Sequence, residues 1–126
     1  VATTYRVVEH WQAGGMSRWI GWLTECQPEM FVEMSKELAA EKKIKNGERV
    51  KIRSARGEIQ AVALVTARFK PFQVEGKTVH QVGMPWHFGW GGLAKGDMAN
   101  DLTPHVGDAN TTIPEYKAFL VDVNKA

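Results

Sequence analysis

Residues 9–18 carry side chains that suit the binding of a polar, anionic molecule. The stretch combines hydrogen-bond donors, a stacking ring and two glycines: His10, Trp11, Gln12, Gly14, Gly15, Ser17 and Arg18. Arg18 presents a planar fork of donors that matches a phosphate group, and Trp11 can cover a heteroaromatic ring. The alternative is a capping loop in which Trp11 fills the core and Arg18 is merely solvated. This segment alone leaves both interpretations open.

A second stretch, residues 85–117, has similar chemistry. Glycine, proline, asparagine and aspartate recur too often in it for a long helix or strand. Its large apolar side chains nevertheless argue against disorder: Trp86, Phe88, Trp90, Leu93, Leu102 and Tyr116. Long irregular loops that are ordered within a compact domain are usually functional. The sequence therefore predicts a loop that wraps a polar, anionic small molecule.

No side chain is expected to act as a nucleophile or to bind a metal. The histidines at positions 10, 80, 87 and 105 lack the close spacing that places two ligands on one metal. Cys26 has no neighbour that would activate its thiol, so a small buried hydrophobic residue is the better interpretation. The Gly-Lys-Thr sequence at 76–78 is no phosphate-binding P-loop, because Pro71 stands where that motif needs its first glycine.

Length and composition indicate one domain, spanning residues 1–126. Hydrophobic residues make up 44% and charged residues 24%, which is ordinary for a globular protein. The net charge of +2 is too small, and the basic residues too scattered, to predict a nucleic-acid partner. No apolar run approaches the roughly 20 residues that cross a bilayer. Because the chain opens on Val1 and has no signal-like segment, it is expected to be a fragment or a processed piece of something larger.

The elements that must position these loops are short. Alternation of apolar and polar residues predicts strands over residues 3–8, 31–34, 49–54, 58–66, 79–84 and 118–123. A helix is expected over residues 36–43, with Ser35 as its N-cap, and a second hairpin over residues 72–79. Short strands with one or two small helices predict a mainly β fold, a closed or nearly closed barrel.

Five sequence motifs carry a resemblance to one family. They are T-T-Y-R-x-x-E-H-W at 3–11, Q-P-E-x-F-V-E-M-S at 27–35, I-K-N-G-E-R-V-K-I-x-S-A-R-G at 44–57, P-W-H-F-G at 85–89, and A-N-D-L-T-P-x-x-G-D-A-N-T-T-I-P-E-Y-K-A-F-L-V at 99–121. Together they resemble the C-terminal domain of the large, catalytic subunit of formate dehydrogenases, in the molybdopterin oxidoreductase superfamily. The last motif and the E-G-K hairpin at 75–77 resemble the respiratory, periplasmic branch.

This resemblance implies a six-stranded double-psi β-barrel with long loops that close over two molybdopterin guanine dinucleotides carrying molybdenum or tungsten. It also implies which residues contact this cofactor: Arg6, His10, Trp11, Gln12, Ser17, Arg18, Trp86, His87, Asn100, Thr103, Tyr116 and Lys117. The metal ligand and the catalytic residues lie in other domains in the family. Gly14-Gly15 departs from the bulkier pairs of some relatives, which puts individual contacts around residues 12–17 in doubt.

The implied function is to enclose the cofactor of an enzyme that oxidises formate to carbon dioxide and passes two electrons to an iron–sulfur relay. The isolated chain is expected to be inactive. Implied partners are the other domains of the large subunit, an iron–sulfur subunit and, in some members, a membrane-anchoring cytochrome subunit, in the periplasm. Alternatives are the equivalent domain of a formylmethanofuran dehydrogenase or a nitrate reductase, or a small nucleic-acid-binding barrel that uses its tryptophans as stacking platforms.

Two further expectations concern the surface. The loops 6–18 and 86–117 are expected to converge on one face of the barrel and to form a single groove. Trp19, Ile20, Trp22 and Leu23 form an apolar cluster that either meets another domain or packs on the barrel as an ordinary amphipathic helix.

Overall fold

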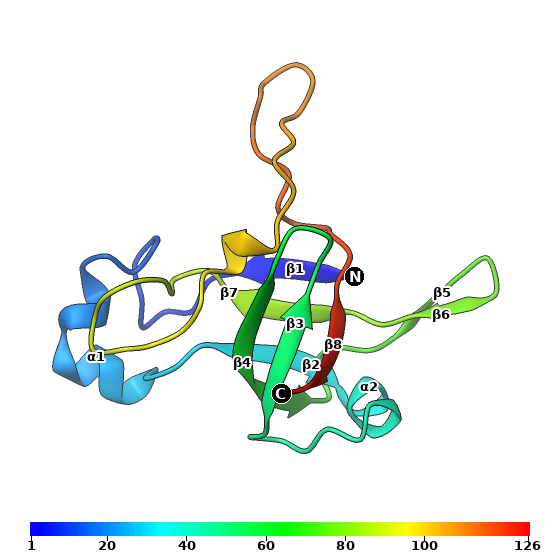
Figure 1. Ribbon diagram of the computed structural model, residues 1–126, viewed down its shortest axis with the longest axis horizontal. Helices are drawn as coiled ribbons and strands as arrows, with labels where there is room; N and C mark the ends of the chain where they lie inside the picture. Colours follow the sequence, from blue (N-terminus) through cyan, green and yellow to red (C-terminus); the bar gives the residue numbers. More distant parts are fainter.

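A six-stranded mixed sheet with short helices at its margins organises the chain (Figure 1). The computed structural model describes all residues from Val1 to Ala126. Its elements are, in chain order, β1 (Ala2–Tyr5), η1 (Ser17–Trp19), α1 (Gly21–Cys26), β2 (Phe31–Ser35), α2 (Lys36–Glu41), β3 (Arg49–Arg53), β4 (Glu58–Thr66), β5 (Phe72–Val74), β6 (Lys77–Val79), β7 (Val82–Pro85), η2 (Ala99–Asp101) and β8 (Asp122–Lys125). None of its helices has the length and apolar content needed to cross a membrane.

The strand order of the sheet is β1-β7-β2-β4-β3-β8, so neighbours in space are mostly distant in sequence. Two pairs are parallel, β1 with β7 and β2 with β4, and the other pairs are antiparallel. An isolated bridge between Ala2 and Phe119 joins β1, at one edge, to the segment that leads into β8 at the other. Two backbone hydrogen bonds of 2.7 and 3.2 Å form this bridge.

The expected alternation of side chains is seen in the hairpin of β3 and β4. Val50 and Ile52 of β3 lie opposite Ala61 and Ile59 of β4, and all four are buried. They belong to a single core of 20 buried apolar residues. Burial of this apolar surface is the main force that stabilises the sheet, and it fixes the register because a slip of one residue would expose these side chains.

Several expected boundaries were wrong. The strand expected over residues 3–8 ends at Tyr5. The last expected strand, 118–123, is divided: Phe119 bridges to β1, whereas residues 122–125 pair with β3. The helix expected over 36–43 ends at Glu41, and Lys43 adopts a positive φ of 56°, which terminates the turn.

The expected burial of Cys26 was also wrong, because its side chain is exposed.

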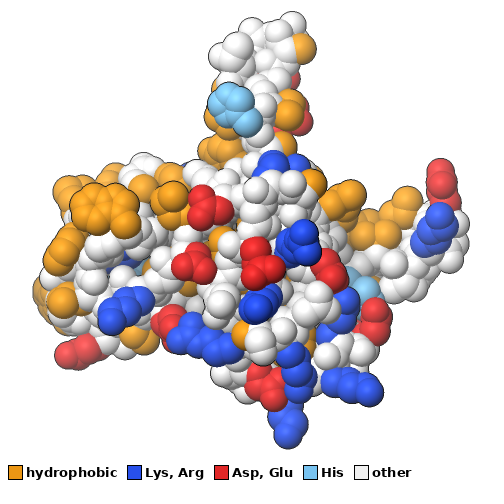
Figure 2. Space-filling model, viewed as in Figure 1, with side chains coloured by type: hydrophobic (Ala, Val, Ile, Leu, Met, Phe, Trp, Pro, Cys, Tyr) orange, Lys and Arg blue, Asp and Glu red, His pale blue; other side chains and the backbone are white.

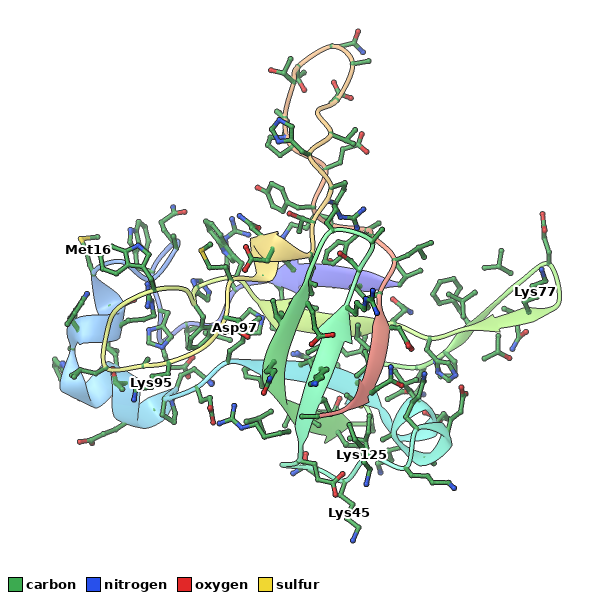
Figure 3. All side chains as sticks on the ribbon, viewed as in Figure 1. Met16, Lys45, Lys77, Lys95, Asp97 and Lys125 are labelled. Carbon is green, nitrogen blue, oxygen red and sulfur yellow. The ribbon has the colours of Figure 1, made fainter.

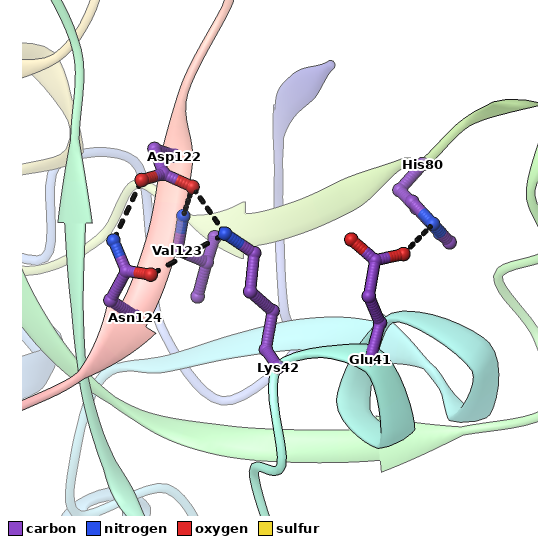
Figure 4. A network of polar contacts seen from close by, with 6 residues as sticks. All are labelled: Glu41, Lys42, His80, Asp122, Val123 and Asn124. Carbon is purple, nitrogen blue, oxygen red and sulfur yellow. Dashed lines mark hydrogen bonds and ion pairs between the residues drawn. The ribbon is translucent and has the colours of Figure 1, made fainter. Parts of the chain in front are cut away.

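Helix α2 is held to the rest of the molecule by side chains near its C-terminal end (Figure 4). Lys42 donates to Asp122 of β8 at 2.7 Å, and His80 lies 3.0 Å from Glu41. At the other end, the Ser35 hydroxyl accepts from the Leu38 amide at 3.1 Å, as the sequence predicts for an N-cap. These contacts orient the helix, so that Leu38 and Ala39 face the core.

Two segments project from the sheet (Figure 1). One is the hairpin of β5 and β6, whose turn residues Glu75 and Gly76 both have positive φ, as a two-residue hairpin turn requires. The other is an arm between η2 and β8, where Asp108 and Ile113 share a backbone hydrogen bond of 3.0 Å. Both segments therefore keep their shape through local hydrogen bonds.

Candidate functional site

The parallel pairing of β1 and β7 brings the two polar loops to the same edge of the sheet. Tyr5 lies opposite Pro85 in this pair, so Arg6 and Trp86 are the first residues beyond both strands. The guanidinium carbon of Arg6 lies 4.9 Å from the centre of the Trp86 ring. This distance is that of a cation–π interaction, and it places a cation and an aromatic ring side by side where the loops begin.

Lys117 reaches the same edge from the far end of the second loop. Its Nζ donates to the carbonyl oxygen of Thr4 at 2.6 Å and to the Thr4 hydroxyl at 3.3 Å. The Thr4 hydroxyl in turn donates to the carbonyl of Tyr116 at 3.2 Å. Thr4 thus fixes the position of the lysine, a role that the sequence interpretation missed because Thr4 reads as an ordinary strand residue.

Arg6 and Lys117 are cations without a carboxylate partner, since neither takes part in an ion pair. Partial burial lowers the pKa of Lys117, and the nearby charge of Arg6 lowers it further. The indole Nε1 of Trp86 is buried and has no hydrogen-bond partner. Unpaired cations and an unused donor at one edge form a site that would accept an anion with hydrogen-bond acceptors.

His87 joins the two loops. Its Nε2 accepts from the Val7 amide at 2.9 Å, and its Nδ1 donates to the carbonyl of Gln12. The ring is 1% exposed, and this burial lowers the pKa of His87, because a charged imidazolium is poorly solvated there. The neutral ring with a proton on Nδ1 satisfies both contacts.

Arg18 makes a second connection between the loops. Its guanidinium donates to the carbonyls of Gly89 and Trp90 at 3.0 to 3.2 Å, and to that of Gly91. Its own carbonyl accepts from the amide of Leu93 at 2.7 Å. Arg18 is 5% exposed, so the structure places its charge on backbone carbonyls of the second loop and not in solvent.

His10 and Ser17 organise the first loop from inside. The Nε2 of His10 lies 2.8 Å from the Gln27 carbonyl, and its Nδ1 lies 3.2 Å from the Ser17 hydroxyl. That hydroxyl also accepts from the Trp11 amide at 2.9 Å. Both ring nitrogens of His10 therefore have partners within the chain.

Glycine at position 14 is required by the close approach of the loops. A Cβ at Gly14 would lie 2.0 Å from the His87 carbonyl oxygen, and its φ is +77°. A Cβ at the adjacent Gly15 would meet nothing within 4 Å. The two loops are thus in contact near their starts, as the expected convergence requires.

A family comparison matches this arrangement. Residues 1–120 match the model of the Molydopterin dinucleotide binding domain. The chain belongs to this family. A polar cofactor with two phosphates agrees with the donors and cations that the fold collects at the ends of β1 and β7.

Relatives of this dinucleotide-binding domain include parts of formate dehydrogenases. The chain is 55% identical to the formate dehydrogenase subunit alpha of Megalodesulfovibrio gigas and 53% identical to the nitrate-inducible formate dehydrogenase major subunit of Escherichia coli. The resemblance read from the sequence is thereby confirmed. Each match covers all of this chain but only 12% of the relative. The chain therefore spans about an eighth of the length of these curated relatives.

A solved structure has the same fold. The acetylene hydratase from Pelobacter acetylenicus matches 99% of this chain and 18% of its own with a TM-score of 0.77, at 13% identity. At that identity the likeness concerns the fold alone. It supports a mainly β, six-stranded domain with short helices, as the sequence predicts.

The remaining predicted site residues are spread along the two loops. Trp11 and Gln12 are exposed on the first loop, where Gln12 has a φ of 51° and uses its carbonyl on His87. Asn100 is exposed on η2, and Thr103 donates to the Asn100 carbonyl at 3.1 Å. Tyr116 is partly buried beside Lys117, whose Nζ lies 5.4 Å from the centre of its ring. No contact joins Asn100 or Thr103 to the first loop.

Two clefts lie beside the sheet edge at which β1 and β7 end. One of about 550 Å³ is lined by residues of the first loop and two neighbouring aromatic rings, including Arg6, Phe31 and Phe69. The other, of about 470 Å³, is lined by Tyr116, Lys117 and residues of the projecting arm. Arg6 and Lys117 therefore each line a cleft large enough for part of a nucleotide.

Proposed function

We propose that this domain binds and encloses a bis-molybdopterin guanine dinucleotide cofactor, carrying molybdenum or tungsten, as part of the large subunit of a formate dehydrogenase. The observation that carries the proposal is the pair of unpaired cations, Arg6 and Lys117, beside the free indole donor of Trp86. A pyrophosphate offers the negative charge and acceptor oxygens that these three groups lack. The residues present fit the cofactor.

The chain's own residues divide into two roles in this proposal. Arg6, Trp86 and Lys117 would hold the dinucleotide directly, and Tyr116, Trp11, Gln12, Asn100 and Thr103 would supply further ring, amide and hydroxyl groups along the loops. His10, Ser17, Arg18 and His87 would hold the loops in place, since they already make hydrogen bonds within the chain, although the buried Nε of Arg18 has no partner. When bound, the metal and pterin supply the redox chemistry. The protein fixes their position.

We also infer that the sheet closes into the double-psi barrel of this superfamily. The two parallel pairs and the interleaved strand order support this topology. The bridge between Ala2 and Phe119 supports closure, because it joins the two edges of the sheet. The arrangement would explain how residues 80 positions apart, such as Val7 and His87, come to lie at one edge.

The complete enzyme would oxidise formate to carbon dioxide and pass two electrons to an iron–sulfur subunit, in some forms with a membrane-anchoring cytochrome subunit, in the periplasm. Supporting this placement, one similar relative is named as the alpha subunit of a cytochrome c-553 formate dehydrogenase from Nitratidesulfovibrio vulgaris. The domain by itself is proposed to be inactive, because it would contribute positioning groups only.

The test removes the two cations from the full-length large subunit. Arg6→Gln with Lys117→Met should lower the guanine nucleotide released from the purified protein by acid hydrolysis about tenfold or more, since each charge-assisted hydrogen bond contributes roughly 1.5 to 3 kcal/mol. The thermal midpoint should fall only modestly, because neither charge is part of an ion pair and the fold loses only the hydrogen bonds from Lys117 to Thr4 and the contact of Arg6 with Trp86. Full retention of nucleotide by the folded double variant would refute the assignment.

Lys45→Met is the matched control, because Lys45 is exposed and lies away from β1 and β7 (Figure 3). It removes one positive charge of the same kind, and nucleotide content should not change.

A substrate panel on the complete enzyme, with formate, formylmethanofuran and nitrate, separates the formate assignment from the two related ones. Nucleotide retention tests the cofactor site independently of that panel.

A further inference from the structure

A group of large, exposed apolar side chains lies on and around η1 and α1 and on the second loop. We define the tryptophan face by five residues: Met16, Trp19, Trp22, Trp90 and Leu93. Their exposed fractions run from 55% for Leu93 to 75% for Trp22 and 87% for Trp90. In Figure 2, hydrophobic side chains gather over the end of the molecule that carries η1 and α1, and Figure 3 labels Met16 there.

The face is large for a surface that meets only water. A tryptophan side chain presents roughly 150 to 250 Å², so the three tryptophans expose on the order of 400 Å². The largest apolar patch on a typical monomer is about 300 to 600 Å² and often functional. With Met16 and Leu93 added, the tryptophan face lies at or above the upper end of this range.

Few charged side chains lie along the segments that form the face. Residues 10–24 contain one that is always charged, the buried Arg18, which is bonded to carbonyls of the second loop. Residues 86–94 contain none apart from the titratable His87, whose pKa burial lowers. The exposed Glu25 of α1 and Lys95 stand just beyond these segments, so the face offers a partner mainly apolar contact with one acid and one base at its margin.

The face is also held in one arrangement by the fold. The Arg18 guanidinium donates to the Trp90 carbonyl at 3.2 Å, and the Leu93 amide donates to the Arg18 carbonyl at 2.7 Å. A Cβ placed on Gly91 would lie 3.4 Å from the Trp19 ring, so this ring packs against the second loop. Because these bonds exist without a partner, little conformational entropy would be lost when one docks.

We propose that the tryptophan face packs against another domain of the same large subunit. The proposal rests on the proposed membership in that subunit, and the length of chain outside this domain supports it: the matched relatives are about eight times longer than the region they share with it. A covalently linked domain is present at high effective concentration. The occupant is thus an apolar, weakly charged surface of the same polypeptide.

A lipid bilayer or a nucleic acid fits less well. Surfaces that bind anionic membranes usually combine aromatic residues with exposed lysine or arginine, and nucleic-acid sites need basic groups for the phosphates. The one arginine beneath the tryptophan face is buried, and a single exposed lysine, Lys95, lies near it together with the exposed Glu25. Most charged side chains in Figure 2 lie over the part of the molecule that carries β3, β4 and β8, and only a few border the hydrophobic ones.

The test places a photoreactive benzoylphenylalanine at position 22 or 90 of the full-length large subunit. Both side chains are mostly exposed in this domain, and the replacement keeps a bulky aromatic ring, so folding should be preserved. After irradiation, mass spectrometry should find a link from each position to a peptide of the same polypeptide outside residues 1–126. The same probe at Lys45, on the charged side of the molecule, should give no such link.

Links to a second copy, to another subunit or to lipid would overturn the proposal, as would the absence of any link from both positions. The readout does not depend on cofactor content. A parent subunit that holds no nucleotide but forms the internal link would therefore speak against the cofactor site alone. A parent subunit that holds nucleotide but forms no internal link would speak against the docking surface alone.

Discussion

Two groups of charged residues on either side of Tyr5 differ in how their charges are satisfied. Around Glu33, which is 1% exposed, the carboxylate accepts from the Tyr5 hydroxyl at 2.9 Å, the Thr66 hydroxyl at 2.8 Å and the Arg68 guanidinium. Around Arg6, one residue further along the chain, two cations have no anionic partner. The charge of Glu33 is balanced within the fold, whereas the charges of Arg6 and Lys117 have no anion in the fold to balance them.

The comparison shows how a structural network can be told from a binding site. Burial alone would raise the pKa of Glu33, but the hydrogen bonds from Arg68, Thr66 and Tyr5 outweigh it and lower the pKa. For Lys117, burial and a like charge both lower the pKa, and no carboxylate in the fold offsets them. The Glu33 network thus serves stability, whereas the uncompensated charges of Arg6 and Lys117 agree with the proposed binding of an anion.

The largest expected effect comes from breaking the complete network. Glu33→Gln removes the charge and replaces one acceptor oxygen with a donor, so that Tyr5, Thr66 and Arg68 compete for a single oxygen. The free energy of unfolding should fall by roughly 2 to 4 kcal/mol, below the range for fully buried pairs because the Arg68 side chain is 71% exposed. Chemical denaturation measures this loss.

Glu25→Gln is the control for that experiment. Glu25 is exposed on α1 and forms no ion pair. Its substitution should change stability by less than about 0.5 kcal/mol. If the two variants lost equal stability, the Glu33 network would have no special part in holding β2 to β4.

A smaller effect is expected from pH, at the junction between the loops. Because the pKa of His87 is lower in the folded state, the unfolded chain binds a proton first as pH falls. Stability should therefore be full above about pH 6.5, the ordinary histidine value, and should decline as pH falls from there toward the folded pKa. The protection factor of the Val7 amide, whose N–H is bonded to His87, should fall in the same range.

His87→Gln should remove this part of the pH dependence, because the imidazole whose pKa burial lowers would be gone, while His10, whose ring centre lies 6.2 Å away, would be unchanged. The Glu33 network provides an internal reference for the same pH profile. Because the pKa of Glu33 is lowered, the stability that its carboxylate contributes is present above about pH 4.5, the ordinary carboxylate value, and is lost only below it. A stability profile that stayed flat between pH 6.5 and 5 in the parent protein would contradict the assigned neutral state of His87.

The smallest effect concerns the repulsion between the two cations. Arg6→Gln should raise the pKa of Lys117 toward its ordinary value by removing the like charge, while the larger contribution of burial remains. Carbon-13 resonances of the lysine side chain, followed through a pH titration, report this shift. An unchanged Lys117 titration would mean that Arg6 and Lys117 act as separate sites.

Much of the sheet could be predicted from the sequence because local alternation determined it. The hairpin from Arg49 to Thr66 and the N-cap at Ser35 follow from side chains close together in the chain. The limits of β1 and β8 could not be predicted, since they depend on pairing between Ala2 and Phe119 across the whole chain. Long-range pairing leaves no periodic signal in either segment.

The candidate site divides in the same way. Residue types identified the two loops, but types cannot distinguish a side chain that faces a ligand from one that bonds to the other loop. Arg18 has the chemistry of a phosphate ligand, yet the structure gives it three backbone carbonyls. The sequence also gave no indication that Phe88 would be buried while Trp90, two residues later, would be exposed.

The neighbouring glycines at 14 and 15 are not equivalent, and this bears on how the sequence can vary. At Gly14 any side chain would collide with the His87 carbonyl, whereas Gly15 faces open space. Of these two positions, one therefore sets the gap between the loops and the other leaves it unchanged. A protein of this fold with a larger residue at the first position must hold these two loops further apart, whereas a larger residue at the second leaves their spacing free.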